Sequence, residues 1–91
     1  MGEEPPTKPR VRLYTRPGCH LCDEAKAEMA RADCAGLFDL EEIDVDTDAR
    51  LKSLYGYDVP VVTIDGAHAF KHRLAAADFR REIERAAASR R

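Results

Sequence analysis

The sequence predicts a small α/β domain in which helices cover both faces of one mixed β-sheet. Segments with strand-like and helix-like hydrophobic patterns follow one another in the order β-α-β-α-β-β-α. The first three segments form a βαβ unit, which implies parallel strands joined by a right-handed crossover. An Asp-Gly turn at Asp65-Gly66 joins the last two strand segments as a hairpin, so those strands are expected to be antiparallel.

Length and composition are those of one domain with a modest core. The chain has 91 residues, 44% hydrophobic and 35% charged, with a net charge of −2. This balance argues against a general affinity for nucleic acid or anionic membranes. We assign residues 1–9, which carry three prolines, to a disordered lead-in, and residues 10–91 to a single domain. Neither a bilayer-spanning segment nor a signal peptide is evident, so we expect a cytoplasmic location.

The first strand and the first helix are expected to meet at a Pro-Gly turn. Residues 11–15 alternate apolar and polar side chains and contain β-formers, and Pro17 and Gly18 end this strand. A helix follows, and Gly36 is expected to end it. Its apolar stripe has spacings of four, four and three residues and comprises Leu21, Ala25, Met29 and Ala32.

The middle of the chain contains a second strand and a short helix. Residues 38–45 contain the strand, centred on Leu40 to Ile43. Asp46 or Thr47 is expected to cap a short helix that reaches about Tyr55, and Gly56 to break it.

The last third predicts the hairpin and a final helix. Residues 59–64 are the most apolar β-run, and residues 67–71 return as the fourth strand. The inner face of the last helix comprises Phe79, Ile83, Ala86 and Ala87.

Two cysteines form a Cys-x-x-Cys motif where the first strand passes into the first helix. The strand-turn-helix context places Cys19 at the amino end of the helix, where unpaired N–H groups and the helix dipole favour a thiolate. We therefore expect its pKa to lie below the free value of about 8.5. Cys22 lies nearly one turn further on the same side, so a disulfide requires little backbone movement. Cys19 can attack a substrate disulfide, and Cys22 can resolve the mixed disulfide.

Four residues are candidates for substrate binding: Arg16, His20, Val59 and Pro60. Arg16 and His20 place cationic or ionisable groups beside Cys19, although each is also an ordinary exposed side chain in this position. Cys34, near the end of the helix, is expected to be a partly buried filler. Val59-Pro60 is a candidate cis peptide, and a trans proline that begins a strand fits equally well.

Other functions fit the same cysteines. His68 and His72 supply an H-x3-H pattern for a zinc site with the cysteines, but the gap from Cys22 is far longer than in a zinc finger. An iron–sulfur centre, and an interaction domain without turnover, are further alternatives. A redox pair is favoured because the motif stands beside a βαβ pattern.

These features together resemble the glutaredoxin-like branch of the thioredoxin superfamily. The resemblance rests on the segments "LYTRPGCHLCDEA", "YGYDVPVV" and "IDG", and it extends from about Val11 to Ala87. It implies a thioredoxin-like fold, a four-stranded mixed sheet flanked by three helices. It also implies thiol-disulfide oxidoreductase activity and a cis Pro60 close to Cys19. The backbone of Val59 would then pair with an extended thiol substrate, like an added strand.

The sequence also departs from these families. Thioredoxins carry Trp-Cys-Gly-Pro-Cys and a buried Asp, but this chain has no Trp and has Leu13 at the Asp position. Glutaredoxins have Pro-Tyr between the cysteines, here His20-Leu21, and a Gly-Gly pair after the fourth strand, here replaced by residues 71–74. We therefore expect weak binding of glutathione.

The resemblance also implies the partners. We expect no resident cofactor or metal, with glutathione as a candidate co-substrate. The substrate is expected to be a protein or small-molecule disulfide, and the reductant glutathione or a thioredoxin-reductase-type protein. We expect a monomer.

Overall fold

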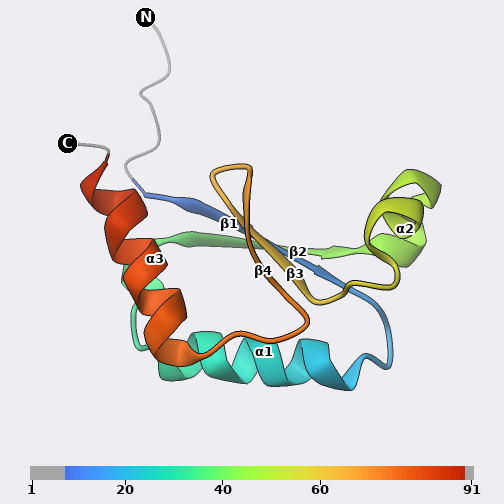
Figure 1. The fold of residues 1–91 in the computed structure, drawn as a ribbon, viewed down its shortest axis with the longest axis horizontal. Helices are drawn as coiled ribbons and strands as arrows, with labels where there is room; N and C mark the ends of the chain where they lie inside the picture. The colour runs from blue at the N-terminus through green and yellow to red at the C-terminus, as the bar shows by residue number, and fades with distance from the viewer. Residues whose placement is uncertain (1–7, 90–91) are drawn as a thin grey trace, which may run out of the picture.

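The computed structural model describes residues 8–89, and over this range the chain forms four strands and three α-helices (Figure 1). Two short 3-10 helices, η1 (Ala35–Leu37) and η2 (Val45–Thr47), flank the second strand. The elements are β1 (Arg10–Thr15), α1 (His20–Arg31), β2 (Asp39–Asp44), α2 (Ala49–Tyr55), β3 (Val61–Ile64), β4 (Ala67–Lys71) and α3 (Ala76–Ala88).

The sheet is mixed, with strand order β2-β1-β3-β4. β1 and β2 are parallel because α1 carries the chain back across the sheet between them. β3 is antiparallel to both β1 and β4. Thr15 pairs with Asp44 and Tyr14 with Val61, so the last residues of β1 and β2 and the first residue of β3 lie at the same end of the sheet. The segment that follows Thr15 and the segment that precedes Val61 therefore meet at this end.

Strand alternation divides the apolar side chains between two cores. Val11 and Leu13 pack with Val62, Phe79 and other residues in the core that contains residues of α1 and α3. On the other face lies a smaller cluster formed by Tyr14, Val45 and Val61, against which Ile43, Leu51, Tyr55 and Val59 pack. Helices thus cover both faces, with α1 and α3 opposite α2 (Figure 1).

Two predicted helix boundaries were wrong. α1 ends at Arg31 rather than at Gly36, because Asp33 takes a left-handed conformation (φ 54°) and the chain turns to bury Cys34 and Phe38. The cap of α2 is Asp48 rather than Asp46 or Thr47, because Val45–Thr47 form η2. The carboxylate of Asp48 accepts hydrogen bonds from the N–H groups of the first two residues beyond Ala49, at 2.8 and 3.1 Å.

Pro9 belongs to the folded domain, although it lies one residue before the predicted domain boundary. Pro9 was assigned to the lead-in, yet it is fully buried and its carbonyl accepts a hydrogen bond from Asp39 N–H at 3.0 Å. This bond belongs to the first residue pair of β1 and β2, Arg10 with Asp39. The rest of the predicted lead-in, residues 1–7, lies outside the described residues. No helix within residues 8–89 is long and apolar enough to cross a membrane.

Candidate functional site

A tight turn after β1 places Cys19 at the amino end of α1. The N–H of Cys19 donates to the carbonyl of Arg16 at 3.2 Å. Gly18 has φ 73°, a left-handed conformation that costs a residue with a Cβ about 1–2 kcal/mol. Cys19 itself is extended (φ −82°, ψ 107°) and occupies the N-cap position of α1. The sequence therefore places a thiol where a helix most often has a hydroxyl or carboxylate.

The two cysteines face each other but differ in exposure. Their Cα atoms are 5.2 Å apart and their sulfur atoms are joined as a disulfide. The Sγ of Cys19 also accepts a hydrogen bond from the N–H of Cys22 at 3.1 Å. Cys19 is partly exposed, whereas Cys22 is 2% exposed. The pair thus consists of one sulfur that a substrate can reach and one that lies beneath it.

A shallow groove of about 290 Å³ runs beside the cysteine pair. Besides both cysteines, it is lined by Thr15, Arg16, Pro17, Gly18, Asp23, Lys26, Glu42 and Asp44. Within it, Lys26 Nζ lies 3.1 Å from Glu42 Oε2 and 3.9 Å from Asp23 Oδ1. The sequence prediction missed both Lys26 and Glu42. The spacing of Lys26, four residues after Cys22, was a visible signal, but Glu42 reaches the site only through the register of β2.

Arg16, a predicted substrate-binding residue, is engaged within the protein. Its Nε lies 3.0 Å from Asp46 Oδ1, and its Nη1 donates to the carbonyl of Gly56 at 3.2 Å. These bonds tie the turn before Cys19 to η2 and to the end of α2. Arg16 also lines a second groove with Ala49, Lys52, Ser53, Gly56 and Tyr57, and the Tyr57 side chain is 95% exposed.

His20, the other predicted neighbour of the thiol, pairs along its own helix. Its Nε2 lies 3.1 Å from Glu24 Oε2, and its side chain is 88% exposed. This i,i+4 arrangement gives the imidazole a carboxylate partner on the outer surface of α1.

Val59 and Pro60 lie at the same edge of the sheet as the cysteines. The peptide bond between them is cis. Pro60 is fully buried, and its carbonyl accepts a hydrogen bond from the N–H of His72 at 2.8 Å. Because Tyr14 pairs with Val61, Pro60 is level with Thr15, four residues before Cys19.

The two histidines considered as zinc ligands have separate partners. His68 Nε2 lies 3.4 Å from the hydroxyl of Tyr55, and His72 Nε2 lies 3.8 Å from Asp58 Oδ1. In the part of the chain that the structure describes, no three Cys, His, Asp or Glu side chains are grouped so that they could hold a metal ion.

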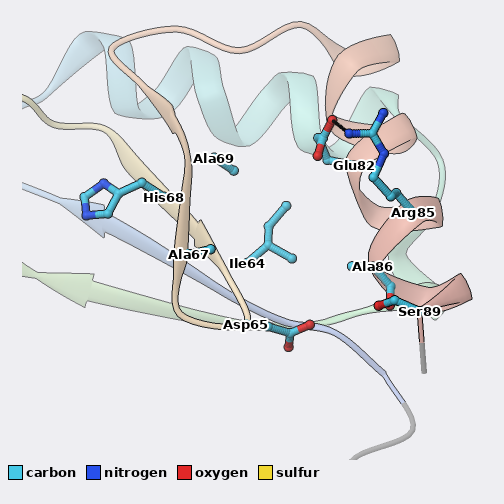
Figure 2. A pocket seen from close by; sticks show the side chains of 9 residues that line it. All are labelled: Ile64, Asp65, Ala67, His68, Ala69, Glu82, Arg85, Ala86 and Ser89. Atoms are coloured by element: carbon cyan, nitrogen blue, oxygen red, sulfur yellow. Dashed lines mark hydrogen bonds and ion pairs between the residues drawn. The ribbon is translucent and has the colours of Figure 1, made fainter.

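A hollow of about 530 Å³ lies at the opposite end of the sheet, between the β3–β4 hairpin and α3 (Figure 2). The small side chains of Ala67, Ala69 and Ala86 leave this space, and the Glu82–Arg85 group stands at its rim (Figure 2). Ile64, another lining residue, pairs with Val11 near the start of β1. The hollow is therefore remote from the cysteines along the sheet.

Comparisons with known proteins agree on family and fold. Residues 10–84 match the sequence profile of the Glutaredoxin-like domain (DUF836). The chain is 39% identical over 70 residues to the "Glutaredoxin-like protein YDR286C homolog" of Dictyostelium discoideum; the match covers 70% of this chain and 65% of that protein, just under two thirds of its length.

Among solved structures, the X-ray structure of protein XcR50 from X. campestris superposes with a TM-score of 0.71 at 31% identity, covering 82% of this chain and 96% of that one. Chloroplastic thioredoxin z, at 17% identity, superposes with a TM-score of 0.72, covering 90% of this chain and 80% of that one, and shows the fold alone. The predicted thioredoxin-like fold, with its four-stranded mixed sheet and three helices, is confirmed.

Proposed function

The chain belongs to the glutaredoxin-like domain family, and from this premise we propose that it is a thiol-disulfide oxidoreductase with Cys19 as nucleophile and Cys22 as resolving thiol. One observation carries the proposal. The partly exposed Cys19 caps α1, while Cys22 lies 2% exposed and within disulfide reach of it. An accessible attacking thiol above a sheltered second thiol suits a two-step exchange.

In the first step, the thiolate of Cys19 attacks one sulfur of a substrate disulfide. The substrate S–S bond breaks, its other sulfur leaves as a thiolate and takes up a proton, and a mixed disulfide joins Cys19 to the substrate. The N–H of Cys22, 3.1 Å from the Sγ of Cys19, supports this step because a hydrogen bond and the helix dipole both favour the thiolate.

In the second step, Cys22 loses its proton and attacks the Sγ of Cys19. The bond between Cys19 and the substrate breaks, and the second substrate thiol is released. Two electrons have then passed from the dithiol to the substrate, and the Cys19–Cys22 disulfide remains. A separate reductant returns the pair to the dithiol form.

The substrate segment is proposed to run alongside Val59 in an extended conformation. Val59 lies two residues before the start of β3, at the end of the sheet to which the register also brings Cys19, so an added strand there would reach the thiol. Pro60 would shape this surface, and Arg16 and His20 would meet polar groups of the substrate. The substrate class remains a protein or a small-molecule disulfide.

Glutathione is expected to be a poor reductant. The backbone N–H of His72 donates to the carbonyl of Pro60 and that of Arg73 to the carbonyl of Lys71, both at 2.8 Å. These two amides are therefore occupied where glutaredoxins offer free backbone to glutathione. Each charge-assisted hydrogen bond that is lost costs about 1.5–3 kcal/mol, or about tenfold to a hundredfold in affinity. We propose a protein reductant of the thioredoxin-reductase type and a cytoplasmic setting, where such systems keep thiols reduced.

Turnover of a small disulfide tests the proposed chemistry. We expect the wild-type protein to reduce hydroxyethyl disulfide and the Cys19→Ser variant to be inactive. The Cys22→Ser variant should accumulate a mixed disulfide on Cys19, visible by mass spectrometry. A fully reduced Cys22→Ser variant that forms no mixed disulfide, together with an inactive wild-type protein, would support the interaction-domain alternative, and metal bound to the reduced protein would support the metal site.

The same preparation tests the reductant. Oxidised protein is mixed with glutathione or with thioredoxin reductase and NADPH, and the rate of dithiol formation is followed. We expect the reductase to be faster. Tight glutathione binding, with chemical-shift changes around Arg16, Val59 and Arg73, would contradict this reasoning.

A further inference from the structure

Lys26 lies beside Cys22, the resolving cysteine. It follows Cys22 by four residues on α1, so the two side chains lie on one face of the helix, about one turn apart. Both line the groove beside the disulfide, where the ammonium of Lys26 is 3.1 Å from Glu42 Oε2. A cation is thus held near a thiol that is 2% exposed.

The second step of the exchange creates a charge at this place. Cys22 must become a thiolate while its surroundings exclude most solvent, and burial disfavours the charged form of a thiol. A neighbouring cation offsets that penalty.

We propose that Lys26 is a positioning residue for the resolving step, whose ammonium stabilises the Cys22 thiolate, and that Glu42 holds this ammonium in the groove and partly neutralises it. This inference rests on the proposed function, because it concerns the second of its two steps. This role requires no contact between either residue and the substrate.

The remaining charged groups of the groove are less suited to this role. The Arg16 guanidinium already binds Asp46 and the carbonyl of Gly56. The carboxylate of Asp44 accepts the N–H of Asp46 at 2.8 Å. The Asp23 side chain is 76% exposed and lies 3.9 Å from Lys26. Cys19 carries no charge at this stage, since its sulfur is then bonded to the substrate.

The step balances without further reagents. The proton of the Cys22 thiol leaves to solvent in the groove, whose 290 Å³ is room for several water molecules. The thiolate forms a bond to Cys19 Sγ as the bond from Cys19 to the substrate breaks. The substrate sulfur leaves as a thiolate and takes up a proton. Lys26 keeps its own proton throughout and acts only through its charge.

Neutralising Lys26 and neutralising Glu42 should shift the thiol pKa of Cys22 in opposite directions. Lys26→Gln removes the cation and should raise the thiol pKa of Cys22, whereas Lys26→Arg keeps the charge and should preserve it. Glu42→Gln removes the anion and leaves the ammonium unneutralised, so the pKa should fall. A purely structural role of the ion pair predicts the same direction for Lys26→Gln and Glu42→Gln, because both break the same contact.

The expected rate change is moderate. If the pKa of Cys22 rises by about one unit, the thiolate fraction falls about tenfold near neutral pH, while the remaining thiolate becomes about threefold more nucleophilic. Resolution should therefore slow about threefold to fourfold in Lys26→Gln. The first step, attack by Cys19, should keep its rate.

The chain offers a matched control for this substitution. Arg12 on β1 pairs with Glu41, the neighbour of Glu42, at 3.1 Å, and the Arg12 side chain is 41% exposed compared with 42% for Lys26. Neither Arg12 nor Glu41 lines the groove beside the cysteines. Arg12→Gln therefore removes an equivalent ion pair and should leave the pKa of Cys22 and the resolution rate unchanged.

Two measurements decide the proposal. The pH dependence of Cys22 alkylation is measured in the Cys19→Ser background, with the modified cysteine identified by peptide mass spectrometry. Release of thiol from a preformed mixed disulfide on Cys19 then gives the resolution rate. A raised pKa and slower release in Lys26→Gln, with rescue by Lys26→Arg and the opposite pKa shift in Glu42→Gln, would support the proposal.

Other outcomes overturn it. An unchanged Cys22 pKa in Lys26→Gln, or shifts of the same sign in Lys26→Gln and Glu42→Gln, would show that Lys26 does not act on this thiol. If the Cys22→Ser variant forms no mixed disulfide and the wild-type protein reduces no disulfide, the proposed function fails, and the alkylation profiles in the Cys19→Ser background still decide the electrostatic effect of Lys26.

Discussion

Glu28 on α1 caps α3, and its removal should measurably destabilise the protein. Its Oε1 accepts the backbone N–H of Ala76 at 3.0 Å, at a position where the N-cap residue Ala75 makes no side-chain cap. Loss of a helix cap costs about 0.5–2 kcal/mol, and a partly buried, charge-assisted bond falls in the upper part of this range. The Glu28–Arg31 ion pair is 3.4 Å long, with Arg31 75% exposed, and adds only a few tenths of a kcal/mol.

We therefore expect Glu28→Ala to lower the free energy of unfolding by about 1–2 kcal/mol, or the Tm by about 4–16 °C for a domain of this size. Urea unfolding followed by circular dichroism measures this directly. Glu24→Ala is the matched control, because it makes the same change in helix propensity but removes only a surface pair with His20. Arg31→Ala isolates the contribution of the ion pair. Equal stability losses in Glu28→Ala and Glu24→Ala would refute the assignment of Glu28 as a cap.

Three further predictions follow from single residues. Alkylation of the reduced protein should be fast at low pH and should lose this phase in Cys19→Ser; a variant that keeps it would contradict the role of Cys19. Burial raises the pKa of the Cys34 thiol, against a smaller opposing effect of Arg80, so the folded state holds this proton to higher pH than the unfolded state. Stability should then fall as the pH rises above about 8.5, and less so in Cys34→Ala, as urea unfolding at neutral and alkaline pH can test. Gly66→Ala should lower the free energy of unfolding by about 1–2 kcal/mol, because Gly66 has a left-handed φ of 85°. Gly36→Ala should not destabilise the chain by this amount, because Gly36 does not have such a φ and the space around both glycines is open. Equal urea midpoints for the two variants would count against this account.

Local sequence was enough to predict the elements whose determinants lie within a few residues of one another. The Cys-x-x-Cys motif between a strand and a helix sufficed to place Cys19 at the start of α1, because the Pro-Gly turn and the helical stripe both lie within a few residues of it. Asp65-Gly66 sufficed for the hairpin, since both residues take the positive φ that such a turn requires.

The helix boundaries and the surroundings of the thiols depended on tertiary contacts. α1 ends before Gly36 because Cys34 and Phe38 must reach the core, a demand that no local pattern expresses. Glu42 lines the groove of the cysteines because β2 pairs with β1 in one register, and a shift of one residue would turn it to the other face.

The properties of the two thiols likewise depend partly on the local sequence and partly on the tertiary structure. The residue types and their spacing determine which sulfur stands at the helix end, because helix geometry is local and repeats every 3.6 residues. Which charges surround those sulfurs is decided by strand pairing and by the crossing of α1 over the sheet, which join residues far apart in sequence such as Lys26 and Glu42. Electrostatic effects depend on distance in space rather than along the chain, so only the tertiary structure could identify this pair.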